Sequence, residues 1–137
     1  MNNRQEKALA LHDKGYNCCQ AVALAFLDCF DVDDKALYKL CEGFGFGMGN
    51  SDGVCGALSG AVMLAGLKNS DGNTDGGKTK RETYKISAAM YKAFAEKAGS
   101  VICRTLKGKN NQDVPLYSCN DCITTAVEIA QKILETE

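Results

Sequence analysis

The residues with the clearest chemical potential are the cysteines, of which this 137-residue chain has eight. They stand at positions 18, 19, 29, 41, 55, 103, 119 and 122. The chain does not start like a secretion signal, and outside secreted proteins clustered cysteines more often bind metal or carry out redox chemistry than form structural disulfides. Buried cysteine is also a common small apolar residue, so some of the eight need no chemical function.

Four of the cysteines share one feature: each is expected in the first turn of a helix, just after a residue that commonly caps helices. The pairs are Asn17 with Cys18, Asp52 with Cys55, Ser100 with Cys103, and Ser118 with Cys119. Unpaired N–H groups and the helix dipole favour an anion there, which lowers the pKa of a thiol. Thiolate is the form that attacks disulfides and ligates metals. The residues alone leave open whether the four meet in one site.

The elements that must position these thiols centre on residues 43–66. Glycine alternates with other residues over 43–49, which suits a backbone in conformations closed to side chains with a Cβ. A helix is expected after Ser51 or Asp52. Its side chains are small, so a neighbour must pack very close, either within the chain or from a second copy; a homodimer is left open.

Helical spacing and capping residues place the other elements. Helices are expected over residues 3–14 (ending at Gly15), 18–30, from Asp33 or Asp34 through Cys41, 79–98 with a capping box of Thr79 and Glu82, 101–106, and after Ser118. Residues 107–117 are expected to be a loop, and no segment alternates as a strand does. The predicted fold is therefore all-α: one domain over 1–137, a bundle of about six helices with a glycine-rich loop before the central helix. Cys29 and Cys41 are expected in its core.

Composition excludes several classes of partner. The net charge is −1 with both signs spread along the chain, so no basic surface for nucleic acid is predicted. No apolar run is long enough to span a bilayer, and no polybasic segment suggests membrane binding. We expect a cytoplasmic protein with an unidentified redox partner.

The cysteine pattern resembles the C_GCAxxG_C_C family, bacterial and archaeal proteins of about this length that are described as redox-active. Residues 16–22, Tyr-Asn-Cys-Cys-Gln-Ala-Val, look like its first element, and residues 55–60, Cys-Gly-Ala-Leu-Ser-Gly, match its second. Cys103 looks like the third element and Cys119, or else Cys122, like the fourth. The resemblance covers about residues 6 to 134 and implies that the cysteines share a site. It does not carry over a substrate.

Two cysteines depart from that pattern. Cys19 stands where a small residue such as alanine is expected, and it is either a spare ligand or, as we favour, a small buried residue. Cys119 and Cys122 form a CxxC where the family needs one cysteine. Residues 119 and 122 share a helical face, so both could reach one site.

Redox chemistry is the first interpretation, with Cys18, Cys55, Cys103, Cys119 and Cys122 as catalytic candidates. Cys55 is the expected attacking thiol because flanking glycines would leave it accessible, and Cys18, Cys103 or Cys119 would resolve the mixed disulfide. The protein would then be an oxidoreductase acting through thiols or through a bound iron–sulfur cluster.

Metal ligation is the second interpretation, and the cofactor is left open. An iron–sulfur cluster would take thiolates from Cys18, Cys55, Cys103 and Cys119, with backbone N–H groups at Gly53 and Gly56 stabilising its sulfides. The alternative is a non-catalytic module with structural zinc, for which the usual paired CxxC spacing is absent.

Residues 72–79, Gly-Asn-Thr-Asp-Gly-Gly-Lys-Thr, satisfy the phosphate-binding pattern GxxxxGK[ST]. That motif requires a preceding buried strand, but residues 62–66 are better explained as the end of a helix. Nucleotide binding is therefore the least favoured function, and ordinary turn chemistry explains the stretch.

Overall fold

The computed structural model describes residues 1–108 and 116–135, and in these residues every regular element is helical. The elements are α1 (Asn3–Asp13), α2 (Cys18–Leu24), a 3₁₀ turn (Leu27–Cys29), α3 (Asp34–Glu42), α4 (Gly45–Met48), α5 (Gly56–Asn69), α6 (Lys80–Ala98), α7 (Cys103–Leu106) and α8 (Cys119–Leu134). The all-α prediction is confirmed, although the described residues form eight helices rather than about six. Residues 109–115 of the expected loop lie outside the described residues.

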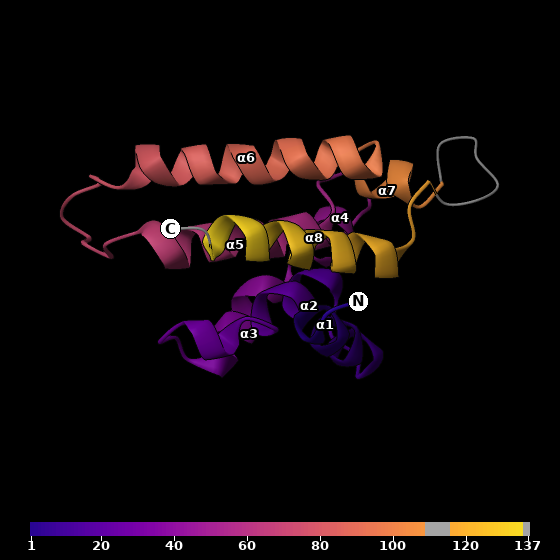
Figure 1. Cartoon of the computed structure of the whole chain (residues 1–137), viewed down its shortest axis with the longest axis horizontal. Coiled ribbons are helices and arrows are strands. Elements are labelled where there is room, and N and C mark those ends of the chain that lie inside the picture. The colour runs from indigo at the N-terminus through magenta and orange to yellow at the C-terminus, as the bar shows by residue number, and fades with distance from the viewer. Residues whose placement is uncertain (109–115, 136–137) are drawn as a thin grey trace.

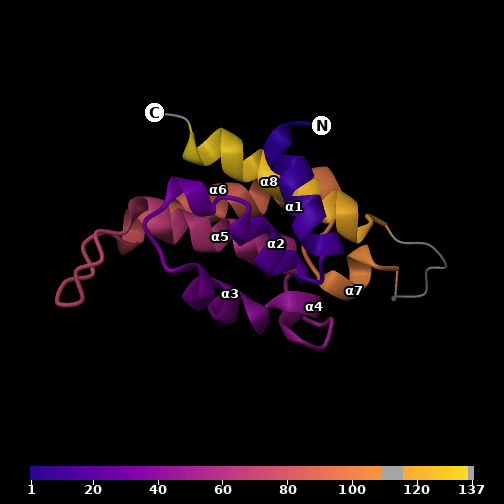
Figure 2. The same cartoon turned by 90° about the horizontal axis from the view of Figure 1, so that it is seen from below.

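The helices lie in three layers (Figure 1). Helix α6 runs along one side, α5 and α8 form the middle layer, and α1, α2 and α3 lie on the other side. Seen from below, α3 and α4 follow one edge of the molecule, and α7 lies near the start of α8 (Figure 2). The middle layer therefore has helices on both of its faces.

Helix α5 is the centre of the core, as its composition predicts. Ala57, Leu58, Ala61, Leu64 and Ala65 are buried, because α5 packs against α2, α6 and α8. Its small residues allow α2 to approach closely: a Cβ added at Gly60 would lie 2.7 Å from the carbonyl oxygen of Cys19. This close neighbour belongs to the same chain.

The glycine-rich segment before α5 contains a short helix and left-handed turns rather than a plain loop. Phe46, Met48 and Ser51 have φ values of 54°, 66° and 66°. Non-glycine residues adopt this region rarely, at a cost of about 1 to 3 kcal/mol each. At Gly47, with φ of 56°, a Cβ would clash with the Cβ of Cys103, so glycine is required there.

Three of the expected helix caps, Asn17, Asp33 and Ser118, are confirmed. Those at Asp52, Thr79 and Ser100 are wrong, and α7 begins at Cys103 after Ile102 as its N-cap residue. The side chains of Asn17 and Ser118 accept hydrogen bonds from the N–H groups of Gln20 and Asp121 at 2.9 and 3.0 Å. Helix α5 begins at Gly56, not after Asp52, because backbone hydrogen bonds with another segment hold residues 53–55 extended. The capping box at Thr79 is absent. The backbone of Thr79 is already helical (φ −94°, ψ −8°), and its side chain makes no capping hydrogen bond to α6.

The helix expected over 18–30 breaks after Leu24, and its last part is the 3₁₀ turn. The guanidinium group of Arg4 donates a hydrogen bond of 2.8 Å to the Ala25 carbonyl oxygen. That bond satisfies a carbonyl left without a helical partner, and the chain turns there. Cys29 is consequently exposed, so its expected place in the core is wrong, whereas Cys41 is buried as expected.

In the part of the chain that the structure describes, no helix combines the length and apolar character needed to cross a bilayer.

Candidate functional site

Five cysteines line one small pocket, which we call the cysteine pocket. They are Cys18, Cys55, Cys103, Cys119 and Cys122, and the wall is completed by Phe46, Gly56, Leu106, Lys107 and Tyr117. The five come from α2, α7, α8 and the residue before α5. The sulfur atoms that the sequence predicted to meet are therefore neighbours around one cavity.

Backbone pairing between two distant segments places Cys55 and Cys103. The Cys55 N–H donates to the carbonyl of Val101 at 2.7 Å, and the Cys103 N–H donates to that of Gly53 at 3.0 Å. Between them, Val54 and Ile102 form an isolated antiparallel bridge. The two segments thus lie side by side and carry both thiols to the same cavity.

All four segments present their first thiol at a helix start. Cys18, Cys103 and Cys119 are the first residues of α2, α7 and α8. Cys55 is the N-cap residue of α5 rather than its third residue. The expected placement is correct for three of them, and Cys55 differs by standing just outside its helix, at the position where a cap group receives backbone N–H groups.

Cys119 is a thiol of the pocket whose pKa is strongly lowered. A hydrogen bond from the Cys18 thiol lowers the pKa of Cys119 to about 5, with further help from the charges of Lys107 and His12, although burial opposes the shift. The same hydrogen bond, together with burial, raises the pKa of Cys18 well above its ordinary value. The two thiols share one proton, which stays on Cys18.

A second pair lies deeper in the pocket. The Cys122 thiol donates a hydrogen bond to the Cys55 sulfur, and the N–H groups of Ala57 and Leu58 add to it, so the pKa of Cys55 is lowered despite its burial. The pKa of Cys122 is raised by the bond that it donates and by burial. Cys55 is only 5% exposed, so the expectation that its flanking glycines leave it accessible is wrong.

Lys107 is the cation beside these sulfurs. Burial lowers the pKa of its ammonium group, but the charges of Cys119, Cys103 and Cys18 outweigh burial and raise it. Its Nζ lies 4.9 Å from the centre of the Phe46 ring, an aromatic face that attracts a cation. Phe46 and Lys107 thus line the pocket together with Cys119, and Lys107 brings a positive charge to it.

His12 has a hydrogen-bond partner outside the pocket. Its Nδ1 lies 2.9 Å from the carbonyl oxygen of Tyr16, and its ring is partly buried. It acts on the pocket only at a distance, through the contribution of its charge to the lowered pKa of Cys119.

Of the two glycines expected to hold a cofactor, one lines the cysteine pocket and the other does not. Gly56 lines the cysteine pocket, where a Cβ would lie 3.0 Å from the Phe44 carbonyl oxygen. Gly53 does not line it: its N–H donates to the Gly47 carbonyl oxygen at 3.0 Å. The backbone N–H of Gly53 is therefore engaged away from the sulfurs.

The five thiols are the right donors for zinc or an iron–sulfur cluster, but the space between them is small. The cavity has a volume of about 20 Å³, which is room for roughly one water molecule. No arrangement of three or more His, Cys, Asp or Glu side chains in residues 1–108 and 116–135 has the geometry to hold a metal ion. The pocket in this form does not fit a cluster, and four of its thiols form two hydrogen-bonded pairs.

Lys107, Phe46 and Tyr117 were missed by sequence reasoning. Lys107 lies one helical turn after Cys103, and a cation at that spacing from an expected thiolate is a usable signal. Phe46 stands within the alternating glycines, but nothing local shows that its ring faces Lys107. Tyr117 is placed by tertiary contacts, with its hydroxyl 2.6 Å from Thr125 Oγ1.

The phosphate-binding pattern at 72–79 has no strand before it in the described residues. Residues 62–66 lie within α5, and residues 72–79 form turns between α5 and α6. The structural context that the motif requires is therefore missing.

Comparison with known proteins gives one match. A family model described as "Putative redox-active protein (C_GCAxxG_C_C)" matches residues 16–133. We find no match among curated proteins or among solved structures. The matched range includes every cysteine of the pocket.

Proposed function

This chain belongs to the C_GCAxxG_C_C family, and from that premise we propose that it carries out thiol–disulfide exchange in the cysteine pocket. The observation that supports this most directly is the pairing of Cys119 with Cys18 beside Lys107. A thiol whose pKa is lowered to about 5 is a thiolate at neutral pH. Its neighbour Cys18 keeps a proton and can act as the resolving thiol.

The attacking residue in this proposal is Cys119 rather than Cys55. Cys119 is partly exposed, whereas Cys55 and Cys103 are buried. A disulfide substrate RSSR can therefore reach the sulfur of Cys119 with the least movement of the chain. The Lys107 ammonium group favours the thiolate before attack.

The exchange balances in two steps. The Cys119 thiolate attacks one sulfur of RSSR; the new S–S bond joins Cys119 to RS, and RS⁻ leaves. Cys18 then gives up its proton and attacks the Cys119 sulfur, which forms the Cys18–Cys119 disulfide and releases the second RSH. The substrate is reduced by two electrons, and the protein is oxidised by two.

Cys55 and Cys122 are proposed as an inner dithiol of the same pocket. They repeat the arrangement of the outer pair, with one lowered and one raised pKa joined by a hydrogen bond. A disulfide formed at Cys18–Cys119 can pass to them by a second exchange, which would return the outer pair to its reduced form. Cys103 lines the pocket and is the remaining catalytic candidate.

The test uses oxidised glutathione with reduced protein under anaerobic conditions at pH 6. Wild-type protein should release two molecules of glutathione for each protein disulfide that forms, and Cys18→Ala should release one and keep the other bound to Cys119, as mass spectrometry would show. Cys29→Ser, which changes the exposed thiol outside the pocket, is the matched control.

Two results would overturn the proposal. One is Cys119→Ala protein that reacts at pH 6 as fast as wild type. The other is stoichiometric iron and sulfide in protein purified without oxygen, since that would make the cysteines ligands of a cluster.

A further inference from the structure

A second thiol group lies outside the cysteine pocket, between α2 and α3. Cys19 and Cys41 are both 0% exposed and belong to a separate apolar cluster with Ala23, Leu24 and Leu37. The Cys19 thiol donates a hydrogen bond to the Cys41 sulfur. We call these two residues the Cys19–Cys41 pair.

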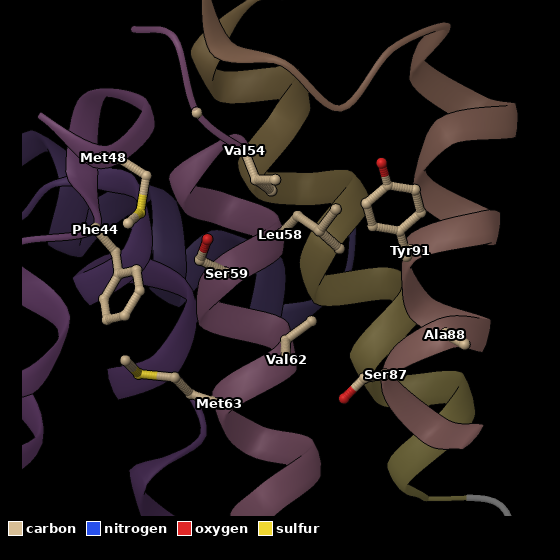
Figure 3. Close-up of a pocket in the computed structure, with 11 residues that line it drawn as sticks. Phe44, Met48, Val54, Leu58, Ser59, Val62, Met63, Ser87, Ala88 and Tyr91 are labelled. Atoms are coloured by element: carbon tan, nitrogen blue, oxygen red, sulfur yellow. The ribbon is translucent and has the colours of Figure 1, made fainter. Parts of the chain in front are cut away.

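A third sulfur connects this pair to the surface. The Sγ of Cys41 lies 3.3 Å from the Sδ of Met63. Met63 lines an open apolar groove of about 790 Å³ between α5 and α6, where its side chain extends toward the ring of Phe44 (Figure 3). Met63 therefore contacts Cys41 on one side and lines the open groove on the other.

We propose that Cys19 and Cys41 form a second dithiol couple, which a peroxide oxidises to a disulfide linking α2 to α3. The sequential neighbours Cys18 and Cys19 would then serve two different couples, one on each side of α2. This inference does not depend on the proposed exchange at Cys119, because it rests on a different cluster and a different oxidant.

The surroundings favour a disulfide over a bound metal ion. Two thiols and a thioether are the donors that Cu(I) prefers, but a bound Cu(I) with two thiolates carries a net negative charge. Leu37, Phe44 and Met63 are among the hydrophobic residues packed in this cluster, and no lysine, arginine or histidine charge contributes to the lowered pKa of Cys41. An uncompensated charge there is costly, whereas a disulfide is neutral.

The reaction balances with hydrogen peroxide as the oxidant. The Cys41 sulfur attacks one peroxide oxygen; an S–O bond forms, the O–O bond breaks, and the leaving hydroxide takes up the Cys41 proton as water. The Cys19 sulfur then attacks the Cys41 sulfur, which forms the S–S bond and breaks the S–O bond. The departing hydroxide takes the Cys19 proton, so two thiols and one peroxide give one disulfide and two waters.

The hydrogen bond within the pair explains why Cys41 would be the sulfur that attacks the peroxide. The hydrogen bond from Cys19 lowers the pKa of Cys41 although burial opposes this, and the same bond with burial raises the pKa of Cys19. Cys41 is also the member of the pair in contact with Met63. Both observations make Cys41 the nucleophile and Cys19 the resolving thiol.

The test maps disulfides in folded protein. Reduced Cys29→Ser protein is treated with hydrogen peroxide at pH 7, unfolded, alkylated with N-ethylmaleimide and digested. We expect a crosslinked peptide whose fragment ions join Cys19, not Cys18, to Cys41, and which dithiothreitol cleaves. Cys55→Ala on the same background should keep this link, and Cys41→Ala should lose it.

The proposal is overturned if Cys19 and Cys41 both carry N-ethylmaleimide after peroxide has consumed the thiols of the cysteine pocket. That result comes from protein without any change at the pair, so it does not depend on whether Cys41→Ala folds. Links within the cysteine pocket are read from the same map, which keeps the outcome separate from that of the proposed exchange at Cys119.

Discussion

Cys18 and Cys19 are consecutive residues, yet they belong to two different thiol groups. Cys18 faces a cavity built from the starts of helices, with Lys107 on its wall. Cys19 faces the apolar contact between α2 and α3. In both groups one thiol donates a hydrogen bond to another and lowers its pKa, but among the described residues a lysine charge contributes to the shift of Cys119 and none contributes to that of Cys41. The two groups therefore allow the effect of a neighbouring thiol on a cysteine pKa to be separated from the effects of a nearby cation and of a helix N-terminus.

The largest effect on stability is expected at Gly60, where α5 packs against the backbone of α2 that carries both Cys18 and Cys19. A Cβ at Gly60 would lie 2.7 Å from the Cys19 carbonyl oxygen and 3.3 Å from its Cα. Because backbone atoms cannot move aside cheaply, Gly60→Ala should lower the free energy of unfolding by about 1–3 kcal/mol. Urea denaturation under reducing conditions measures this.

Gly66 in the same helix is the matched control. A Cβ there meets no atom within 4 Å, so Gly66→Ala should stabilise the protein by roughly 0.5–1 kcal/mol. Equal effects of the two substitutions would contradict the close contact between α5 and α2.

The next largest effect is on the reactivity of Cys119, which should depend on its partner Cys18 and not on the Cys19–Cys41 pair. Without its hydrogen bond from Cys18, the Cys119 thiolate loses the main cause of its lowered pKa of about 5. In Cys18→Ala, the rate of Cys119 alkylation by iodoacetamide at pH 6 should fall about tenfold or more, since each pKa unit is a tenfold change in thiolate. Peptide mass spectrometry over a pH series gives the midpoint. Cys41→Ala should leave the midpoint unchanged, and a shift there would show that the groups are coupled.

The pairing also makes stability depend on pH. Cys119 has a folded pKa of about 5 against an ordinary 9.0, so its contribution is present above pH 9 and is lost as pH falls toward 5. Cys18 has a raised pKa, so its contribution is present below its ordinary pKa and is lost as pH rises beyond it. The free energy of unfolding should therefore peak near pH 9 in reduced protein. In Cys119→Ala, the free energy of unfolding should change less with pH below pH 9. An unchanged dependence on pH would argue against the proton shared by Cys18 and Cys119.

The smallest effect isolates the cation. Lys107 is a lesser cause of the lowered pKa of Cys119 than the Cys18 thiol. Lys107→Met should raise the alkylation midpoint of Cys119 by less than one unit, and so change the rate at pH 6 by less than about tenfold. Lys85→Met, on an exposed lysine paired with Glu82, should have no effect. A shift as large as that of Cys18→Ala would reverse the order of the two causes.

The helix starts could be predicted because capping chemistry is local. Asn17 and Ser118 act on N–H groups three residues ahead, so their signal lies within one turn of sequence. That information was enough to place Cys18 and Cys119 and, with the family pattern, to expect a shared site.

The errors arose where contacts between distant residues decide the backbone. Cys55 became an N-cap because residues 53–55 pair with 101–103, and Cys29 became exposed because Arg4 binds the Ala25 carbonyl oxygen. The choice of partner for each thiol is likewise tertiary: nothing in the sequence pairs Cys18 with Cys119 or Cys19 with Cys41. Such pairings require the packed structure.

The left-handed segment around Gly47 acts as a partition between two spaces. Phe46 lines the cysteine pocket, whereas Phe44 and Met48 line the apolar groove on the other side (Figure 3). Gly53 and Val54 also line the groove, and Cys55 lines the pocket. Neighbouring residues of the same short segments thus line the two spaces. A molecule bound against Met48 in the groove would therefore contact the same short segment that places Phe46 beside Lys107.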